Sequence, residues 1–138
     1  MNEWPDSTWW ALQWMEKAEN DLLNAEHTLN LGENCPLDTV CFHAQQCAEK
    51  YLKAWLVFYS EEVPRTHDMI VLQQETEQAG LKGIDSEWLF PLNRYSVESR
   101  YPGNWEPIER SEAEDAVDYA RKVRSIIRNS LPKNVFDT

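Results

Sequence analysis

Glycine is scarce in this sequence, with four residues among 138. Hairpin turns and phosphate-binding loops depend on glycine, because glycine adopts positive φ angles without a steric penalty. The scarcity therefore disfavours all-β folds, Walker-type phosphate loops and the glycine-rich fingerprint of dinucleotide-binding folds.

Cysteines and long apolar runs are few as well. The three cysteines, an odd number, suit a reducing compartment better than a disulfide framework. The longest uncharged apolar stretch covers residues 54–60, far short of the roughly 20 residues of a membrane-spanning helix. Residues 1–6 are acidic and lack the basic start and apolar run of a signal peptide. We therefore expect a cytoplasmic protein that does not span a membrane.

Basic side chains are outnumbered, 13 against 24 acidic ones, and the formal net charge is -11. Such a surface as a whole does not attract the negatively charged backbone of nucleic acids, so we expect no DNA partner. Any anion site must be a local group of basic side chains. The length and a hydrophobic content of 42% suffice for one core. We expect a single domain over residues 1–138, with a loose tail from about residue 132.

Apolar residues recur at alternating intervals of three and four, which is the spacing of helices with one buried face. The hydroxyls of residues 7–8 are candidate caps and Gly32 is a stop signal, so a helix is predicted over about residues 8–31. A second helix is predicted from residues 37–39 to a point before Pro64.

The pattern continues through the second half of the chain. Asp68 can cap a helix over about residues 69–78, and a short amphipathic segment is predicted from Ser86 to about residue 97 or 98. Residues 99–107 are dense in turn formers and predict an irregular segment.

A last helix is expected from the capping hydroxyl of Ser111 to the stop at Pro132. Five helices with short connections and no convincing strand predict an all-α fold, a bundle of about five helices. The apolar stripe of the last helix comprises Ala113, Ala116, Val117, Ala120, Val123 and Ile127.

Four polar residues lie at spacings of three, four and three on the second helix, at the border of its apolar stripe: His43, Gln46, Lys50 and Lys53. We call them the polar stripe. A phosphate or nucleotide would find point charges on the lysines and directional donors on the amide and the imidazole. The alternative is a dimer seam or a rim, in which the lysine stems cover apolar surface and pair with carboxylates.

Further cations could approach this stripe if their segments fold back over the second helix. They are Arg65, His67, Arg94 and Arg100. Arg100 is the best candidate, because Tyr101 and Trp105 nearby could stack a base. Alternatively, Arg100 makes a structural bond to a loop carbonyl or a carboxylate.

His43 and Cys47 have a spacing that zinc sites use, with His67 as a possible third ligand. Cys47, however, belongs to the apolar stripe, and buried cysteine is a common core residue. We therefore expect no metal and no other cofactor.

The last helix carries a run of basic residues, whereas the N-terminal third of the chain is acidic. The run comprises Arg121, Lys122, Arg124 and Arg128. The complementary charges indicate either self-association or packing of the two helices. Trp9, Trp10 and Trp14 cannot all lie on the inner face of the first helix, so some are expected to contact a partner. We expect a homodimer.

Three segments resemble the HEPN domain family: the helix-two motif at residues 41–54, the Pro-Arg-Thr-His-Asp run at residues 64–68, and the Arg-Tyr-Pro turn within residues 99–102. The resemblance implies an antiparallel helical bundle with a four-helix up-and-down core. Such a domain is commonly a homodimer and is often encoded beside a minimal nucleotidyltransferase. The resemblance also implies either nucleotide binding or metal-independent RNA cleavage.

Ribonucleases of that family carry an arginine followed four to six residues later by histidine. Histidine occurs here only at 27, 43 and 67, and no arginine precedes any of them at that distance. We therefore expect a nucleotide-binding or accessory module, possible partner of a minimal nucleotidyltransferase, with no catalytic residue. Its expected ligand-binding residues are His43, Gln46, Lys50, Lys53, His67 and Arg100. The alternatives are a toxin-type ribonuclease that pairs Arg100 with His43 or His67, and a purely structural dimerisation module.

Overall fold

The computed structural model describes residues 6–60, 62–96 and 106–137. Within these ranges the secondary structure is entirely helical and contains no strand, which confirms the predicted all-α fold. The α-helices are α1 (Ser7–Leu29), α2 (Leu37–Ser60), α3 (Met69–Gln78), α4 (Ser86–Asn93) and α5 (Arg110–Ser130).

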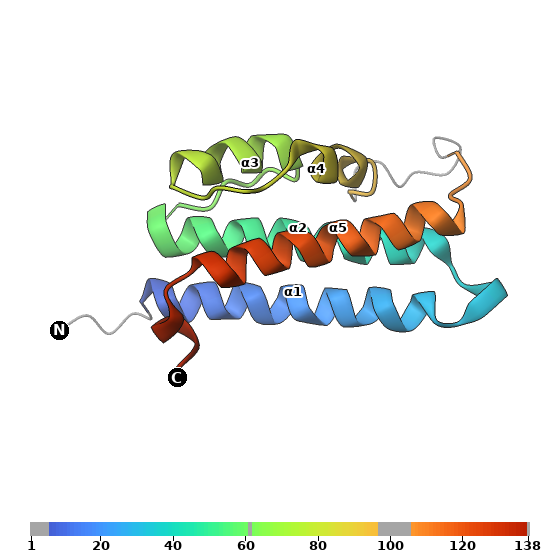
Figure 1. The fold of residues 1–138 in the computed structure, drawn as a ribbon, viewed down its shortest axis with the longest axis horizontal. Coiled ribbons are helices and arrows are strands. Elements are labelled where there is room, and N and C mark those ends of the chain that lie inside the picture. Colours follow the sequence, from blue (N-terminus) through green and yellow to red (C-terminus); the bar gives the residue numbers. More distant parts are fainter. Residues whose placement is uncertain (1–5, 61, 97–105, 138) are drawn as a thin grey trace.

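The three long helices α1, α2 and α5 lie side by side (Figure 1). Of the short helices, α3 packs on α2, and α4 packs on α2 and α5, both on the side away from α1. Helix α2 contacts each of the other four helices. Its core-facing side chains, such as Cys47 and Tyr51, are fully buried. Because α2 is covered on several sides, the charged side chains of Glu49 and Lys53 at the edge of its core have little access to water.

Amphipathic periodicity accounts for the bundle core. All six apolar residues of the predicted α5 stripe are buried, from Ala113 to Ile127. On α1 the same periodicity buries Ala11, Met15 and Ala18. Small alanine side chains on facing helices let the backbones approach closely, so the long helices form a rigid frame.

Two helix starts differ from the sequence prediction. Helix α1 begins at Ser7, and its cap is Asp6, whose carboxylate accepts a hydrogen bond from the Trp9 backbone N–H at 3.0 Å, so the predicted hydroxyl caps are wrong. Helix α5 begins at Arg110 with Glu109 at the cap position and no side-chain capping bond. Ser111 therefore lies inside the first turn.

Two ends also differ. Helix α4 ends at Asn93, four to five residues earlier than predicted, and the residues that follow it form a turn. The chain after Pro132 was expected to be loose, yet Lys133–Phe136 form a 3₁₀ helix with Val135 buried. The Arg128 guanidinium lies 4.6 Å from the Phe136 ring centroid, which ties this segment to α5.

The irregular segment predicted at residues 99–107 lies outside the described residues, apart from 106 and 107, which are not helical. None of the helices in the described ranges has the length and apolar character needed to cross a bilayer.

Candidate functional site

Two members of the polar stripe, His43 and Lys50, face α1 and contact the same carboxylate, that of Asp21. Asp21 of α1 accepts from Lys50 Nζ at 2.6 Å through Oδ2, and its Oδ1 lies 2.8 Å from His43 Nδ1. Asp21 is only 8% exposed. These pairs join α1 to α2 and neutralise the charge of Lys50 within the chain.

The other half of the stripe meets a second buried carboxylate, that of Glu49. Lys53 Nζ donates to Glu49 Oε2 at 3.1 Å, and His67 Nδ1 lies 3.1 Å from both carboxylate oxygens. Gln45 donates to Oε1 at 2.8 Å. Glu49 and Lys53 are 3% and 6% exposed, and the Trp14 ring lies 5.8 Å from Lys53 Nζ. Each buried charge therefore has a partner.

Gln46, the remaining member of the stripe, donates to Gln45 Oε1 at 2.7 Å. Arg100 lies outside the described residues. Of the predicted ligand set, the structure thus pairs four side chains with two intramolecular carboxylates: His43 and Lys50 share Asp21, and Lys53 and His67 share Glu49.

The basic run of α5 also pairs within the chain. Arg121 donates to Glu26 and Arg124 to Glu19, each at 2.5 Å, so the complementary charges noted in the sequence serve the packing of α1 against α5. The Tyr51 hydroxyl donates to Glu19 as well. Burial raises the pKa of Glu19, but the bonds from Tyr51 and Arg124 lower it by more, so the net pKa is below the ordinary value.

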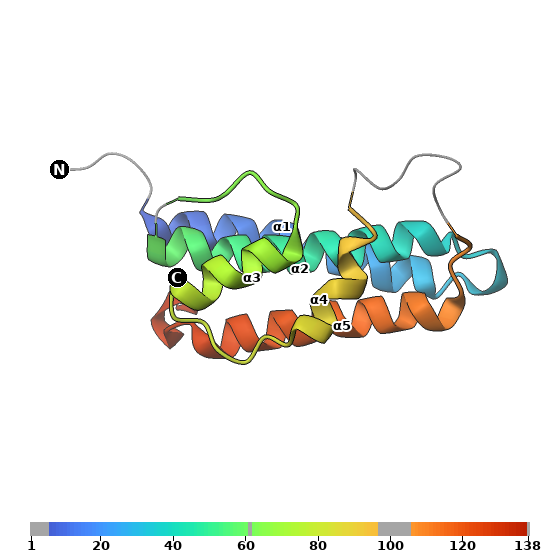
Figure 2. The ribbon, with the colours of Figure 1, turned by 90° about the horizontal axis from the view of Figure 1, so that it is seen from above.

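A polar cleft of about 470 Å³ opens where the α2–α3 connection meets the end of α4. Figure 2 shows this connection as an open loop that returns to the start of α3. The cleft, called the α3 cleft below, is lined by Arg65, Thr66, His67, Asp68, Asn93 and Ser96.

The start of α3 anchors the floor of the α3 cleft. The Asp68 carboxylate accepts from the Ile70 backbone N–H at 2.9 Å and from Asn93 Nδ2 at 3.2 Å. Asn93 Oδ1 accepts from the Met69 backbone N–H at 2.7 Å. The hydrogen bond from Asn93, above all, lowers the pKa of Asp68. Asp68 therefore acts as a helix cap and keeps its negative charge turned to α3.

Arg65 supplies the positive charge of this cleft. Among the described residues, no group forms a hydrogen bond or an ion pair with its guanidinium. His67 shares Nδ1 with Glu49, while its Nε2 has no partner in the same ranges. A carboxylate at Nδ1 favours the proton there, which leaves Nε2 available to a ligand. Within the described part of the chain, the α3 cleft thus combines a free cation, a hydroxyl of Thr66 and an oriented imidazole.

Arg65 is one of the further cations predicted from the sequence but is not in the predicted ligand set, which also lacks Thr66, Asn93 and Ser96. A signal was present: Arg65 lies in a connection between helices, whereas the lysines of the polar stripe lie on a helix packed against its neighbours.

The fold and this geometry can be set beside known proteins. A protein-family model, the HEPN domain, matches residues 11–130. The chain belongs to the HEPN domain family. Members of this family are generally nucleotide-related or ribonuclease-like modules. The match runs from within α1 to the end of α5, so it includes the α3 cleft and the buried carboxylates Asp21 and Glu49 with their partners.

A solved structure resembles this HEPN domain along most of its length. It is the crystal structure of TT1696 from Thermus thermophilus, at a TM-score of 0.74 and 28% sequence identity. The similarity covers 88% of this chain and 98% of that chain. A search of curated proteins finds no match.

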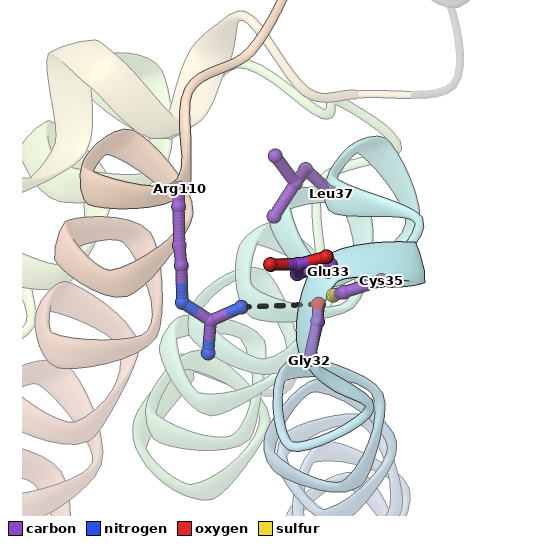
Figure 3. Close-up of a pocket in the computed structure, with 5 residues that line it drawn as sticks. All are labelled: Gly32, Glu33, Cys35, Leu37 and Arg110. Carbon is purple, nitrogen blue, oxygen red and sulfur yellow. Dashed lines mark hydrogen bonds between the residues drawn. The ribbon is translucent and has the colours of Figure 1, made fainter.

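A second pocket of this HEPN domain, of about 370 Å³, lies beside the α1–α2 connection. Figure 3 shows Arg110 reaching across it toward Gly32. The guanidinium donates to Gly32 O at 3.4 Å and to Leu29 O at 2.8 Å, so it caps the carbonyl end of α1. The donors of Arg110 therefore already have partners.

Two of the three thiols of the HEPN domain, those of Cys41 and Cys47, are buried. Burial raises the pKa of Cys41 to about 12, and burial also raises the pKa of Cys47. A thiol with a raised pKa stays protonated near neutrality and is a poor nucleophile. The described ranges contain no group of three or more His, Cys, Asp or Glu side chains that could hold a metal.

Proposed function

We propose that this HEPN domain is a nucleotide-binding module and that the α3 cleft takes the phosphate groups. One observation carries the proposal: Arg65 is unpaired in the described structure, whereas Lys50 and Lys53 are bound to carboxylates. A phosphate at Arg65 displaces no carboxylate of the described residues. A phosphate at the polar stripe would have to compete with Asp21 or Glu49.

The neighbours of Arg65 suit a phosphate oxygen. Thr66 Oγ1 accepts from the Asp68 backbone N–H at 3.0 Å, which leaves its hydroxyl proton free to donate to a ligand. His67 is held by Glu49, so its ring needs little reordering on binding. Arg100 remains a predicted further contact, and His43, Gln46, Lys50 and Lys53 support the fold around the cleft.

The test is calorimetric titration of ATP into the wild type and Arg65→Ala. A hydrogen bond to a charged group contributes about 1.5–3 kcal/mol, so Arg65→Ala should lower affinity by at least about tenfold. Lys82→Ala is the matched control, since Lys82 is exposed, follows α3 rather than preceding it, and has no partner among the described residues. Equal affinity of the wild type and Arg65→Ala would contradict the proposal.

The second candidate is a ribonuclease, favoured by the Glu49–His67 contact. A carboxylate that orients an imidazole beside an arginine is an arrangement suited to general acid–base cleavage of a phosphodiester. The absent arginine-to-histidine spacing favours the binding module, so we expect no cleavage of a labelled RNA in EDTA. Cleavage that disappears in His67→Ala would establish the ribonuclease instead.

We also propose that the domain is a homodimer and an accessory to a minimal nucleotidyltransferase. The start of α1 and the end of α2 lie at the same end of the bundle (Figure 1). They expose Trp9, Trp10 and Tyr59 at 45%, 46% and 45%, which supports contact with a partner. Sedimentation as a dimer at micromolar concentration supports the homodimer, and a monomer contradicts it.

Co-purification of a nucleotidyltransferase with the domain tests the second part of the proposal. A dimer that binds neither a ligand nor this enzyme would indicate a purely structural module.

A further inference from the structure

A third concave site lies between α4 and α5, which contact each other. Its volume is about 190 Å³, and its lining shares no residue with the α3 cleft in the part of the chain that the structure describes. The lining residues are Pro91, Tyr95, Glu112, Asp115, Ala116 and Tyr119. These residues provide two carboxylates and two phenol rings, so their charge is opposite to that of Arg65.

The two carboxylates of this cleft differ in their partners. Glu112 accepts from Arg94 Nη1 at 2.8 Å and from the Tyr95 hydroxyl. Asp115 is exposed and makes no hydrogen bond or ion pair with the part of the chain that the structure describes. One carboxylate is therefore held in place, and the other is available to a cation from outside.

The aromatic walls already face cations of the same chain. The Arg94 guanidinium carbon lies 5.9 Å from the Tyr95 ring centroid, and Lys122 Nζ lies 6.0 Å from that of Tyr119. Such distances allow a cation–π attraction. Arg94 and Lys122 already occupy these two rings, so the Asp115 carboxylate is the group of the cleft that is left for a positively charged side chain from outside.

Helix α4, which contributes Pro91 to the cleft, also carries an exposed apolar side chain. Phe90, next to Pro91 on α4, is 62% exposed, although an aromatic side chain of this size is usually buried. The exposed carboxylate of Glu87 lies on α4 as well, whereas that of Asp118 on α5 is paired with Lys122 at 3.2 Å. A guest that suits both features carries a basic residue next to an apolar one, and the net charge of -11 attracts it.

We propose that the α4–α5 cleft binds a basic segment of a protein partner, whose arginine or lysine meets Asp115 between Tyr95 and Tyr119 while a neighbouring apolar side chain covers Phe90. This surface is independent of nucleotide binding at the α3 cleft. On this proposal, the acidic charge of the domain serves to attract the basic partner.

The experiment is an NMR titration of the full ¹⁵N-labelled chain with the peptide acetyl-Leu-Arg-Leu-amide. We expect shift changes grouped at Asp115, Ala116, Tyr119 and Phe90. Asp115→Asn should weaken binding by about three- to fivefold, as expected for loss of one accessible ion pair. Glu77→Gln on α3 is the charge-matched control and should bind like the wild type. A peptide with norleucine in place of arginine should not produce these shifts.

Other outcomes overturn the proposal. Shifts scattered over the acidic surface, or equal weakening by Glu77→Gln, would show charge attraction without a site. Equal binding of the norleucine peptide would show apolar docking on Phe90 alone. Arg65→Ala should leave the peptide affinity unchanged, so failure here and failure at the α3 cleft are distinguishable.

Discussion

The polar stripe of α2 and the loop that precedes α3 both carry cations, but among the described residues only the loop leaves one of them free. Lys50 and Lys53 lie on a helix that four others contact, and each is paired with a carboxylate that is nearly buried. Arg65 lies in an exposed connection. Taking an unpaired charge out of water costs several kcal/mol, so a cation at the edge of a core needs a partner, whereas a loop cation keeps its hydration. A basic stripe on a central helix is therefore weak support for a ligand site.

Removing the buried carboxylate should have the largest effect. Glu49→Ala leaves Lys53 buried without a counter-charge, and we expect a loss of about 3–5 kcal/mol in the free energy of unfolding. Urea denaturation measures it. The double variant Glu49→Ala with Lys53→Met should regain much of the loss, because no buried charge remains at this pair. A loss below about 1 kcal/mol for Glu49→Ala would show that Lys53 reaches water, and the contrast between the two regions would fail.

Lys50→Ala should have an intermediate effect, on stability rather than on binding. Asp21 keeps only His43, and since the Lys50 side chain is 24% exposed we expect a loss of about 1–2 kcal/mol. Lys17→Ala on α1 is the control, because Lys17 is exposed and has no partner in the described ranges. ATP affinity should stay at the wild-type value in both variants. A tenfold drop in Lys50→Ala alone would return the ligand site to the polar stripe.

Substitution of Glu19, which joins α1 to α5 through Arg124, should have a smaller and pH-dependent effect on the free energy of unfolding. The folded pKa of Glu19 lies below its unfolded value of about 4.3, so its contribution is present above that pH and is lost as the pH falls through the folded value. We expect Glu19→Gln to flatten the decline in stability between about pH 5 and pH 3. At pH 7 the loss should stay below about 1 kcal/mol, because the side chain is 37% exposed and screened. Thermal unfolding across this range measures it, and parallel curves for the two proteins would contradict the assignment.

Arg65→Ala should change stability least. An exposed side chain without a partner among the described residues contributes within about 0.5 kcal/mol, so the unfolding midpoint should match the wild type while ATP affinity falls. Arg65→Lys should regain part of the affinity, since a lysine supplies the charge but not the bidentate geometry. A clear loss of stability in Arg65→Ala would place Arg65 with the structural cations of α2.

Much of the fold was predictable because its signals are local. Helix α3 covers the predicted residues, since the Asp68 cap and Gly80, whose φ is 94°, mark its ends within the sequence itself. The end of α4 was not predictable in this way. Tyr95 continues the apolar spacing and is 1% exposed, yet it reaches the core from a turn after the helix has ended. Periodicity reports burial, and burial does not require helical backbone.

The sequence by itself determined the helical class, the apolar faces and the family, because these depend on spacings within one helix and on short motifs. Only the tertiary structure decided which charges are paired. Lys50 meets Asp21 and His67 meets Glu49 across 29 and 18 residues of chain, and no spacing rule predicts such pairs. The availability of a cation depends on which carboxylate the fold brings to it, and that depends on helix packing rather than on the residues next to it.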